Sequence, residues 1–187
     1  MKKILRLILC LCLIFSISSC IGKTEYDDKT IARIETIWAE GMGMGFVYKR
    51  IFDFTDEKIY DITYADVEML KKQYKNSPEH YKDYASLEEY EEYLNSRYNV
   101  LIEIIAFTEE DAQSFLKEIK SLGVYTWKER YVTDEIIFDA AGSDINIFFT
   151  DGTKKETYIY FKYPRNYKRI LDAFSKHFNV DCWNDTH

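Results

Sequence analysis

The residues best suited to metal or nucleophilic chemistry lie near the end of the chain. They are His177, Cys182 and His187, with Asp181 and Asp185 close by. Imidazole, thiolate and carboxylate groups are all zinc ligands, but a spacing of five residues between them matches no compact zinc motif. We therefore predict no metal site. We interpret His177 as a residue near the C-terminal end of a helix, where the helix dipole favours a positive ring, and the residues after it as a loose chain end.

Paired carboxylates offer a second kind of chemistry. Examples are Glu109 with Glu110 and Asp134 with Glu135, and two carboxylates at a set separation across a cleft can hydrolyse glycosidic bonds. The sequence has no Gly-x-Ser-x-Gly motif of a serine hydrolase. The glycines of residues 41–45 precede a predicted strand and lack a following Lys-Ser or Lys-Thr pair, which argues against a phosphate-binding loop. We predict that the protein is not an enzyme and has no cofactor; a hydrolase that uses carboxylates is the alternative.

The composition limits the class of protein. The chain has 187 residues, of which 47% are hydrophobic, and only seven glycines and two prolines, so it is neither disordered nor collagen-like. Its net charge of −7 disfavours contact with phosphate backbones, and we expect no nucleic-acid partner. The length is that of one domain with a hydrophobic core.

The first twenty residues have the pattern of an export signal. A positively charged start at residues 1–6 is followed by nine consecutive apolar residues, Leu7 to Phe15, and then by small residues that end at Cys20. Nine helical residues span about 14 Å, less than half of the roughly 30 Å hydrocarbon layer, so a permanent membrane helix is a poor interpretation. The pattern indicates a segment that is removed after export.

The sequence Ile17-Ser18-Ser19-Cys20 resembles the lipobox of bacterial lipoproteins. The resemblance implies cleavage between Ser19 and Cys20, a diacylglyceryl group on the sulfur of Cys20 and usually a further acyl chain, such as palmitate, on its amino group. Two or more chains make attachment to a membrane stable. Ile21, in place of the Asp that retains lipoproteins on the inner membrane, implies the outer membrane in a Gram-negative host. The alternative is an ordinary cleaved signal with an incidental Cys20.

This organisation divides the chain into a signal peptide at residues 1–19, a polar tether without structure at residues 20–30, and a single domain at residues 31–187. After processing and lipidation, Cys182 is the one cysteine left, so the domain has no internal disulfide. We favour a shielded thiol for Cys182 over one that pairs with another chain.

Hydrophobic periodicity predicts the elements of the domain. Alternating or apolar runs predict strands near residues 31–38, 46–54 and 58–64, and a β-branched run predicts a buried strand at residues 100–107. Two helices flank Pro78, and the second carries a stripe of Tyr84, Leu87, Tyr90, Leu94 and Tyr98 that we interpret as core packing.

The C-terminal half adds two helices and a hairpin. Thr108 begins a capping box, and a helix from there ends near Gly123. Asp151-Gly152 marks a hairpin turn. A two-residue turn places Ile147 opposite Glu156, whereas a four-residue loop places it opposite Tyr158 and Ile145 opposite Tyr160; we favour the four-residue loop. A last helix follows Tyr167. The fold class is α+β, with a mostly antiparallel sheet and helices packed on one face.

Residues 107–177 resemble a domain of uncharacterised bacterial proteins, many of them lipoproteins. The resemblance depends on Thr108-Glu109-Glu110-Asp111, on Trp127 and Tyr131, on Asp151-Gly152 and on Tyr163-Pro164-Arg165-Asn166-Tyr167. Residues 139–144 depart from the family, because an Asp-Gly pair followed by Trp is expected there. The family brings no activity with it.

These observations predict a lipid-anchored lipoprotein outside the cytoplasm, held at the cell membrane through Cys20. We expect its domain to be a non-catalytic module that binds a protein or a cell-wall polymer, with an envelope hydrolase as the alternative and a structural envelope component as a third possibility. The 16 tyrosines suit such binding. A composition typical of AT-rich genomes explains them equally simply, and we favour that explanation.

Overall fold

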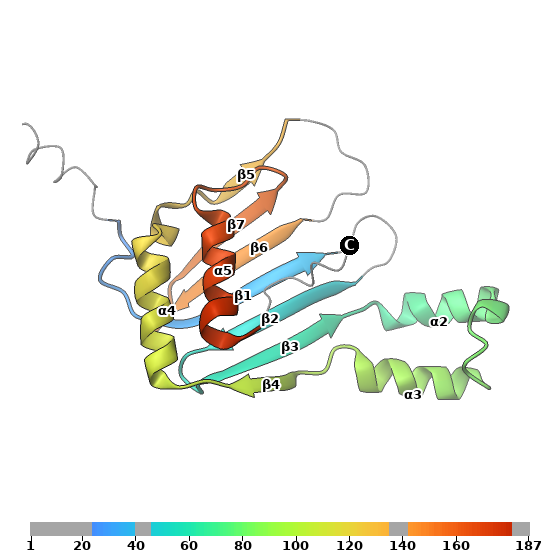
Figure 1. Cartoon of the computed structure of the whole chain (residues 1–187). Helices are drawn as coiled ribbons and strands as arrows, with labels where there is room; N and C mark the ends of the chain where they lie inside the picture. The colour runs from blue at the N-terminus through green and yellow to red at the C-terminus, as the bar shows by residue number, and fades with distance from the viewer. Residues whose placement is uncertain (1–23, 40–45, 135–141, 181–187) are drawn as a thin grey trace, which may run out of the picture.

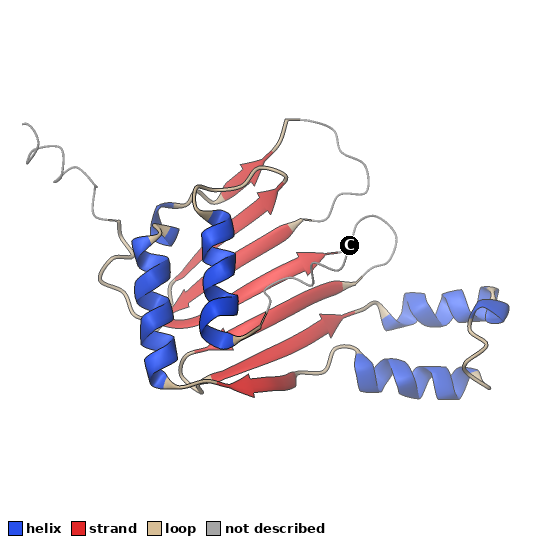
Figure 2. Ribbon diagram, in the orientation of Figure 1, coloured by secondary structure: helices blue, strands red, loops and turns tan. Residues whose placement is uncertain are grey.

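The computed structural model describes residues 24–39, 46–134 and 142–180. These residues form one seven-stranded sheet with two helices on one face and a helical hairpin at one end (Figures 1 and 2). The strand order is β4-β3-β2-β1-β6-β7-β5, so β4 and β5 are the two edges. All neighbouring strands are antiparallel except β5 and β7, which are parallel. The predicted α+β class, with a mostly antiparallel sheet and helices on one face, is confirmed.

The strands come in two sequence blocks separated by helices. The first block is β1 (Ile31–Ala39), β2 (Val47–Asp53) and β3 (Lys58–Tyr64), and β4 (Ile102–Ala106) follows after a helical excursion. The second block is β5 (Arg130–Val132), β6 (Ser143–Phe149) and β7 (Lys154–Tyr160). Pairing of β1 with β6 joins the two blocks into one sheet.

Two helices, α4 (Glu109–Ser121) and α5 (Tyr167–Phe178), cover one face of the sheet (Figure 2). The predicted capping box is present: Asp111 N donates to Thr108 Oγ1 at 3.1 Å, and the Asp111 carboxylate accepts from Thr108 N. The helix ends before Gly123, whose φ of 82° lies in the left-handed region that glycine adopts without strain. The other two helices, α2 (Val67–Asn76) and α3 (Leu87–Arg97), project from the ends of β3 and β4 (Figure 1).

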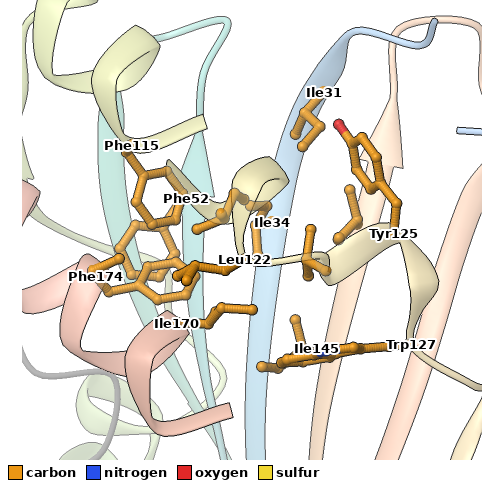
Figure 3. Close-up of a cluster of buried hydrophobic side chains, with 14 of the residues drawn as sticks. Ile31, Ile34, Phe52, Phe115, Leu122, Tyr125, Trp127, Ile145, Ile170 and Phe174 are labelled. Carbon is orange, nitrogen blue, oxygen red and sulfur yellow. The ribbon is translucent and has the colours of Figure 1, made fainter. Parts of the chain in front are cut away.

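The main core lies between the sheet and these two covering helices. Phe52 of β2, Phe115 of α4 and Phe174 of α5 are at most 1% exposed (Figure 3). The ring centroid of Phe174 lies 4.4 Å from that of Phe52 and 4.6 Å from that of Phe115. Alternate residues of β6, Ile145 and Ile147, join the same cluster. Full burial of each such side chain stabilises the fold by about 1.5–3 kcal/mol.

A second, smaller core holds α2 against α3. Leu70, Tyr90 and Leu94 are buried in it, and tyrosine rings surround them. Tyr90 stacks on Tyr74 with ring centroids 5.0 Å apart, and burial, the main cause, raises the pKa of Tyr90 to about 12. The interpretation of the tyrosine stripe of α3 as core packing is therefore confirmed.

Both predicted registers of the β6–β7 hairpin are wrong. Ile147 pairs with Lys155, neither with Glu156 nor with Tyr158. The loop has three residues and ends at Gly152, whose φ of 82° is the left-handed position that a three-residue hairpin loop requires. The predicted loops have two and four residues, whereas a glycine in the left-handed conformation favours the last position of a three-residue loop.

Residues 24–30, the described part of the predicted tether, pack on the domain and do not lack structure. The ring of Tyr26 stacks on Phe149 at 5.2 Å, and Thr150 N donates to Thr30 O at 2.9 Å. Lys29 Nζ lies 3.1 Å from a carboxylate oxygen of Asp151. The polar composition of this segment did not predict its packing, which depends on the ring of Tyr26 and on the ion pair of Lys29 with Asp151.

Candidate functional site

The edge strand β4 carries the most unusual surface among the described residues. All five of its residues are exposed, although the sequence IEIIA contains three isoleucines. Ile102, Ile104 and Ile105 are 48%, 44% and 41% exposed, and Val100 and Leu101 before them are 38% and 52% exposed. The strand predicted at residues 100–107 is present as β4, but the prediction that it is buried is wrong.

The position of β4 at the end of the sheet explains this exposure. It pairs with β3 on one side only, and α4 and α5 cover strands nearer the middle (Figure 1). A run of β-branched residues predicts a strand but does not say whether that strand lies in the middle of the sheet or at its edge. An exposed apolar edge is a hazard, because its free backbone groups can pair with any other extended chain. Such an edge therefore calls for an explanation.

Two features restrain β4 from indiscriminate pairing. The register with β3 shifts at Ile104, where β4 has one residue more than its partner, and such a bulge interrupts a flat edge. Glu103 places a charge in the middle of the strand, but Lys58 Nζ lies 2.8 Å from its carboxylate. Glu103 is therefore the one charged residue of β4 and has a partner within the chain, and the other four residues of the strand are apolar.

The C-terminal end of β4 lies among acidic residues. Asp56 and Glu57 form the turn between β2 and β3, and Phe107, directly after β4, donates its N–H to Glu57 O at 2.9 Å. Glu109 and Glu110 open α4 two residues further on, and all four carboxylates are exposed. This pair, Glu109 with Glu110, was a candidate for hydrolytic chemistry; it lies at a helix N-terminus, where acidic residues are stabilised by the dipole.

Glu118, which lines a groove between α4 and α5, contacts a histidine near the end of α5. His177 lies in the last turn of α5, as expected, and its Nε2 is 2.8 Å from Glu118 Oε2. Lys176 donates to the same oxygen at 2.6 Å, and these two partners, Lys176 first, lower the pKa of Glu118. The groove has a volume of about 380 Å³ and is lined by Glu118 together with Ser114, Lys117, Ser121, Leu122 and Arg169. A carboxylate held ionised in this way is poorly suited to donate a proton.

On the face of the sheet opposite the helices lies a carboxyl whose pKa is raised, in contrast to that of Glu118. Burial, assisted by repulsion from Glu156, raises the pKa of Asp144 in β6. A raised pKa suits a general acid. Asp144 lies across the ladder from Tyr158 and Ile37. The neighbouring Glu35 is only 6% exposed and is paired with Arg33 at 3.1 Å and Lys49 at 3.0 Å.

The segment Tyr163 to Tyr167, which carries part of the family resemblance, contacts Trp127. The indole Nε1 of Trp127 donates to Arg165 O at 3.1 Å, and Asn166 Nδ2 donates to Leu122 O at 3.0 Å. Asn166 has a φ of 63°, which asparagine tolerates better than most residues. These contacts hold the Tyr163–Tyr167 segment against Trp127 and the end of α4.

Several predicted residues lie outside the described part of the chain. They are the lipobox residues Ile17 to Cys20, the glycines of residues 41–45, Glu135, and the tail residues Asp181, Cys182, Asp185 and His187. Ser19 and Cys20 as cleavage and lipid sites therefore stay predictions. Asp134 is described and exposed at the end of a bend after β5.

Comparisons with protein families, with curated proteins and with solved structures find no match to this chain. Within residues 24–39, 46–134 and 142–180, no helix is long and apolar enough to span a membrane. The same residues contain no group of three or more potential metal ligands.

Proposed function

We propose that this protein is a lipid-anchored module outside the cytoplasm that captures an extended segment of a partner protein along β4. The observation that carries the binding part is the edge strand itself, which is apolar, exposed and paired on one side only. A strand added beside it would satisfy backbone groups by hydrogen bonding and remove the isoleucine side chains from water.

The charges around β4 define the chemistry of the partner. Exposed carboxylates of Asp56, Glu57, Glu109 and Glu110 gather at the C-terminal end of the strand, so basic residues on the partner are favoured there. In antiparallel pairing the N-terminal end of the added strand lies at that position. The proposed ligand is therefore an apolar β-branched segment preceded by lysine or arginine.

The anchor rests on the sequence of the first twenty residues. Cleavage after Ser19 and lipidation of Cys20 would hold the domain at the membrane, or at the outer membrane in a Gram-negative host, with the domain facing away from the cytoplasm. Mass spectrometry of the protein purified from native membranes tests this directly. A mass increase of a diacylglyceryl group on a peptide that begins at Cys20 is expected, and an unmodified thiol at residue 20 would contradict the anchor.

Electrostatics in the described residues support binding over hydrolysis. The carboxyl in the α4–α5 groove, Glu118, has a lowered pKa, and the carboxyl with a raised pKa, Asp144, is not among the residues that line this groove. A general acid needs a raised pKa and a position in a cleft in the same residue.

Peptide titration tests the binding site. The probes are the synthetic peptide Lys-Lys-Val-Thr-Val-Thr-Val and its acidic counterpart Glu-Glu-Val-Thr-Val-Thr-Val, each carrying a fluorophore, titrated with the native protein in detergent. We expect saturable binding of the basic peptide, weaker binding of the acidic one, and a difference between them that shrinks as salt is added.

Matched variants locate the bound peptide. Ile104→Lys places a second charge on the edge, as natural edge strands do to prevent pairing, and should abolish binding. Tyr163→Lys makes the same kind of change at a residue that is 60% exposed near the opposite edge, and should leave binding unchanged. Equal binding to both variants would overturn the proposed site. Dimers that depend on Ile104, detected by light scattering, would show that a second copy is the occupant instead.

A further inference from the structure

The loop between β7 and α5 exposes aromatic rings. Phe161 and Tyr163 are 44% and 60% exposed, and they flank Lys162. Phe161 has a φ of 55°, in the left-handed region where a bulky side chain is strained. An exposed and strained phenylalanine contributes little to folding, which points to a role outside the core.

The rings are held in place by neighbours. Tyr163 stacks on Tyr167 with ring centroids 5.0 Å apart, and Tyr167 in turn contacts Trp127 at 6.0 Å. The ring of Phe161 lies edge-on to Tyr160 at 5.3 Å. Pro164 is buried, and the hydrogen bond from Trp127 to Arg165 O fixes the loop backbone between Tyr163 and Tyr167. Little conformational entropy is lost when rings held in this way enter an interface.

This region is basic in an acidic protein. Residues 128–132 and 158–172 contain six basic residues and two acidic ones, whereas the whole chain has a net charge of −7. Lys162 and Arg165 are exposed in the loop itself, and Arg130 lies over the ring of Tyr158 at 5.5 Å. Basic and aromatic side chains together are the composition that proteins place at the interface of a bilayer.

The chain enters the domain next to this region. Tyr26 faces Lys155, whose Nζ lies 5.1 Å from the ring and donates to Trp127 O at 2.6 Å. Trp127 is also the residue that holds the loop through Arg165 O. Four peptide units separate Cys20 from Thr24, which span at most about 14 Å when fully extended. A lipid on Cys20 would therefore keep the bilayer within reach of this side of the sheet.

We infer that the aromatic and basic loop at residues 161–166 contacts an anionic bilayer surface and so orients the anchored domain. Phe161 and Tyr163 enter the headgroup region, and Lys162 and Arg165 face the phosphates. Because the loop lies near β5 and β7, and β4 is the opposite edge of the sheet, contact on this side leaves β4 directed away from the membrane (Figure 1). The inference rests on the proposed anchor but not on peptide binding at β4.

Depth-sensitive fluorescence of the lipidated protein tests the inference. The protein is reconstituted into vesicles of phosphatidylglycerol and phosphatidylcholine, with Tyr163→Cys carrying an environment-sensitive fluorophore in a Cys182→Ser background. Leu101→Cys, at a residue 52% exposed beside β4, is the matched control. We expect a blue-shifted label at position 163 that spin-labelled lipid quenches several times more strongly than the label at position 101.

Charge reversal separates contact with lipid from simple proximity. Lys162→Glu with Arg165→Glu should reduce quenching at position 163, whereas Lys72→Glu with Lys75→Glu, on exposed residues of α2, should not. If the protein floats with the vesicles but the labels at positions 163 and 101 are quenched equally, the contact of the loop with the bilayer is overturned and the anchor is not. Protein that does not float with the vesicles would overturn the anchor as well.

Discussion

If β4 is a binding edge, an apolar side chain there contributes little to stability, and a pair of matched substitutions measures this. Ile104 is 44% exposed, whereas Ile59, on the neighbouring strand and opposite Ile105, is fully buried. Replacement of isoleucine by threonine keeps the β-branch and so preserves strand propensity. At Ile104 the change replaces a half-exposed ethyl group by a hydroxyl that stays hydrated, so the loss should be below about 1 kcal/mol.

The same change at Ile59 carries a larger cost. It replaces a fully buried ethyl group by a hydroxyl that has no hydrogen-bond partner in the core, for a total of about 3–5 kcal/mol. Urea unfolding followed by far-UV circular dichroism measures both losses, because the midpoint shifts in proportion to the loss when the slope is unchanged. Equal losses for Ile104→Thr and Ile59→Thr would refute the reasoning, since they would mean that β4 is covered in the protein in solution.

Three further outcomes follow from individual contacts. Asn166→Ala should destabilise the protein by about 1–2 kcal/mol, and Asn166→Gly by less, because glycine keeps the left-handed backbone; thermal unfolding compares the two. Trp127→Phe removes the indole donor to Arg165 O, so amide hydrogen exchange should quicken in residues 161–166 while the sheet is unaffected. Glu118→Gln should lower the urea midpoint at neutral pH, and the difference from the unsubstituted protein should fade below about pH 4.3. Because the pKa of Glu118 is lowered in the folded protein, its contribution to folding stability is present above the pKa of the unfolded state and is lost as the pH falls through the pKa of the folded state. A difference in urea midpoint that stays constant from neutral pH to below about pH 4.3 would contradict this.

Local signals in the sequence predicted most of the elements. The capping box at Thr108 and the tyrosine stripe of α3 depend on contacts within a few residues, so spacing alone was enough to identify them. The α+β class followed from the same signals, because strands joined by short connections favour antiparallel pairing.

The register of the β6–β7 hairpin was a local error of loop length, whereas the other errors concern contacts between distant parts of the chain. Whether residues 102–106 are buried depends on the order of strands in the sheet, which local periodicity does not encode. The docking of residues 24–30 depends on Phe149 and Asp151, more than a hundred residues away. The candidate site at β4 was missed because the order of strands was not predicted. A signal was present, since an apolar run that leads into Thr-Glu-Glu-Asp has acidic residues beside one end.

Hydrogen exchange along β4 tests the central claim most directly. The native protein is exchanged alone, with the basic peptide and with the acidic peptide, and the amides of Ile102–Ala106 are compared with those of β2. The account predicts that the basic peptide slows exchange in β4 and leaves β2 unchanged. Exchange in β4 that is the same with and without the basic peptide would contradict it.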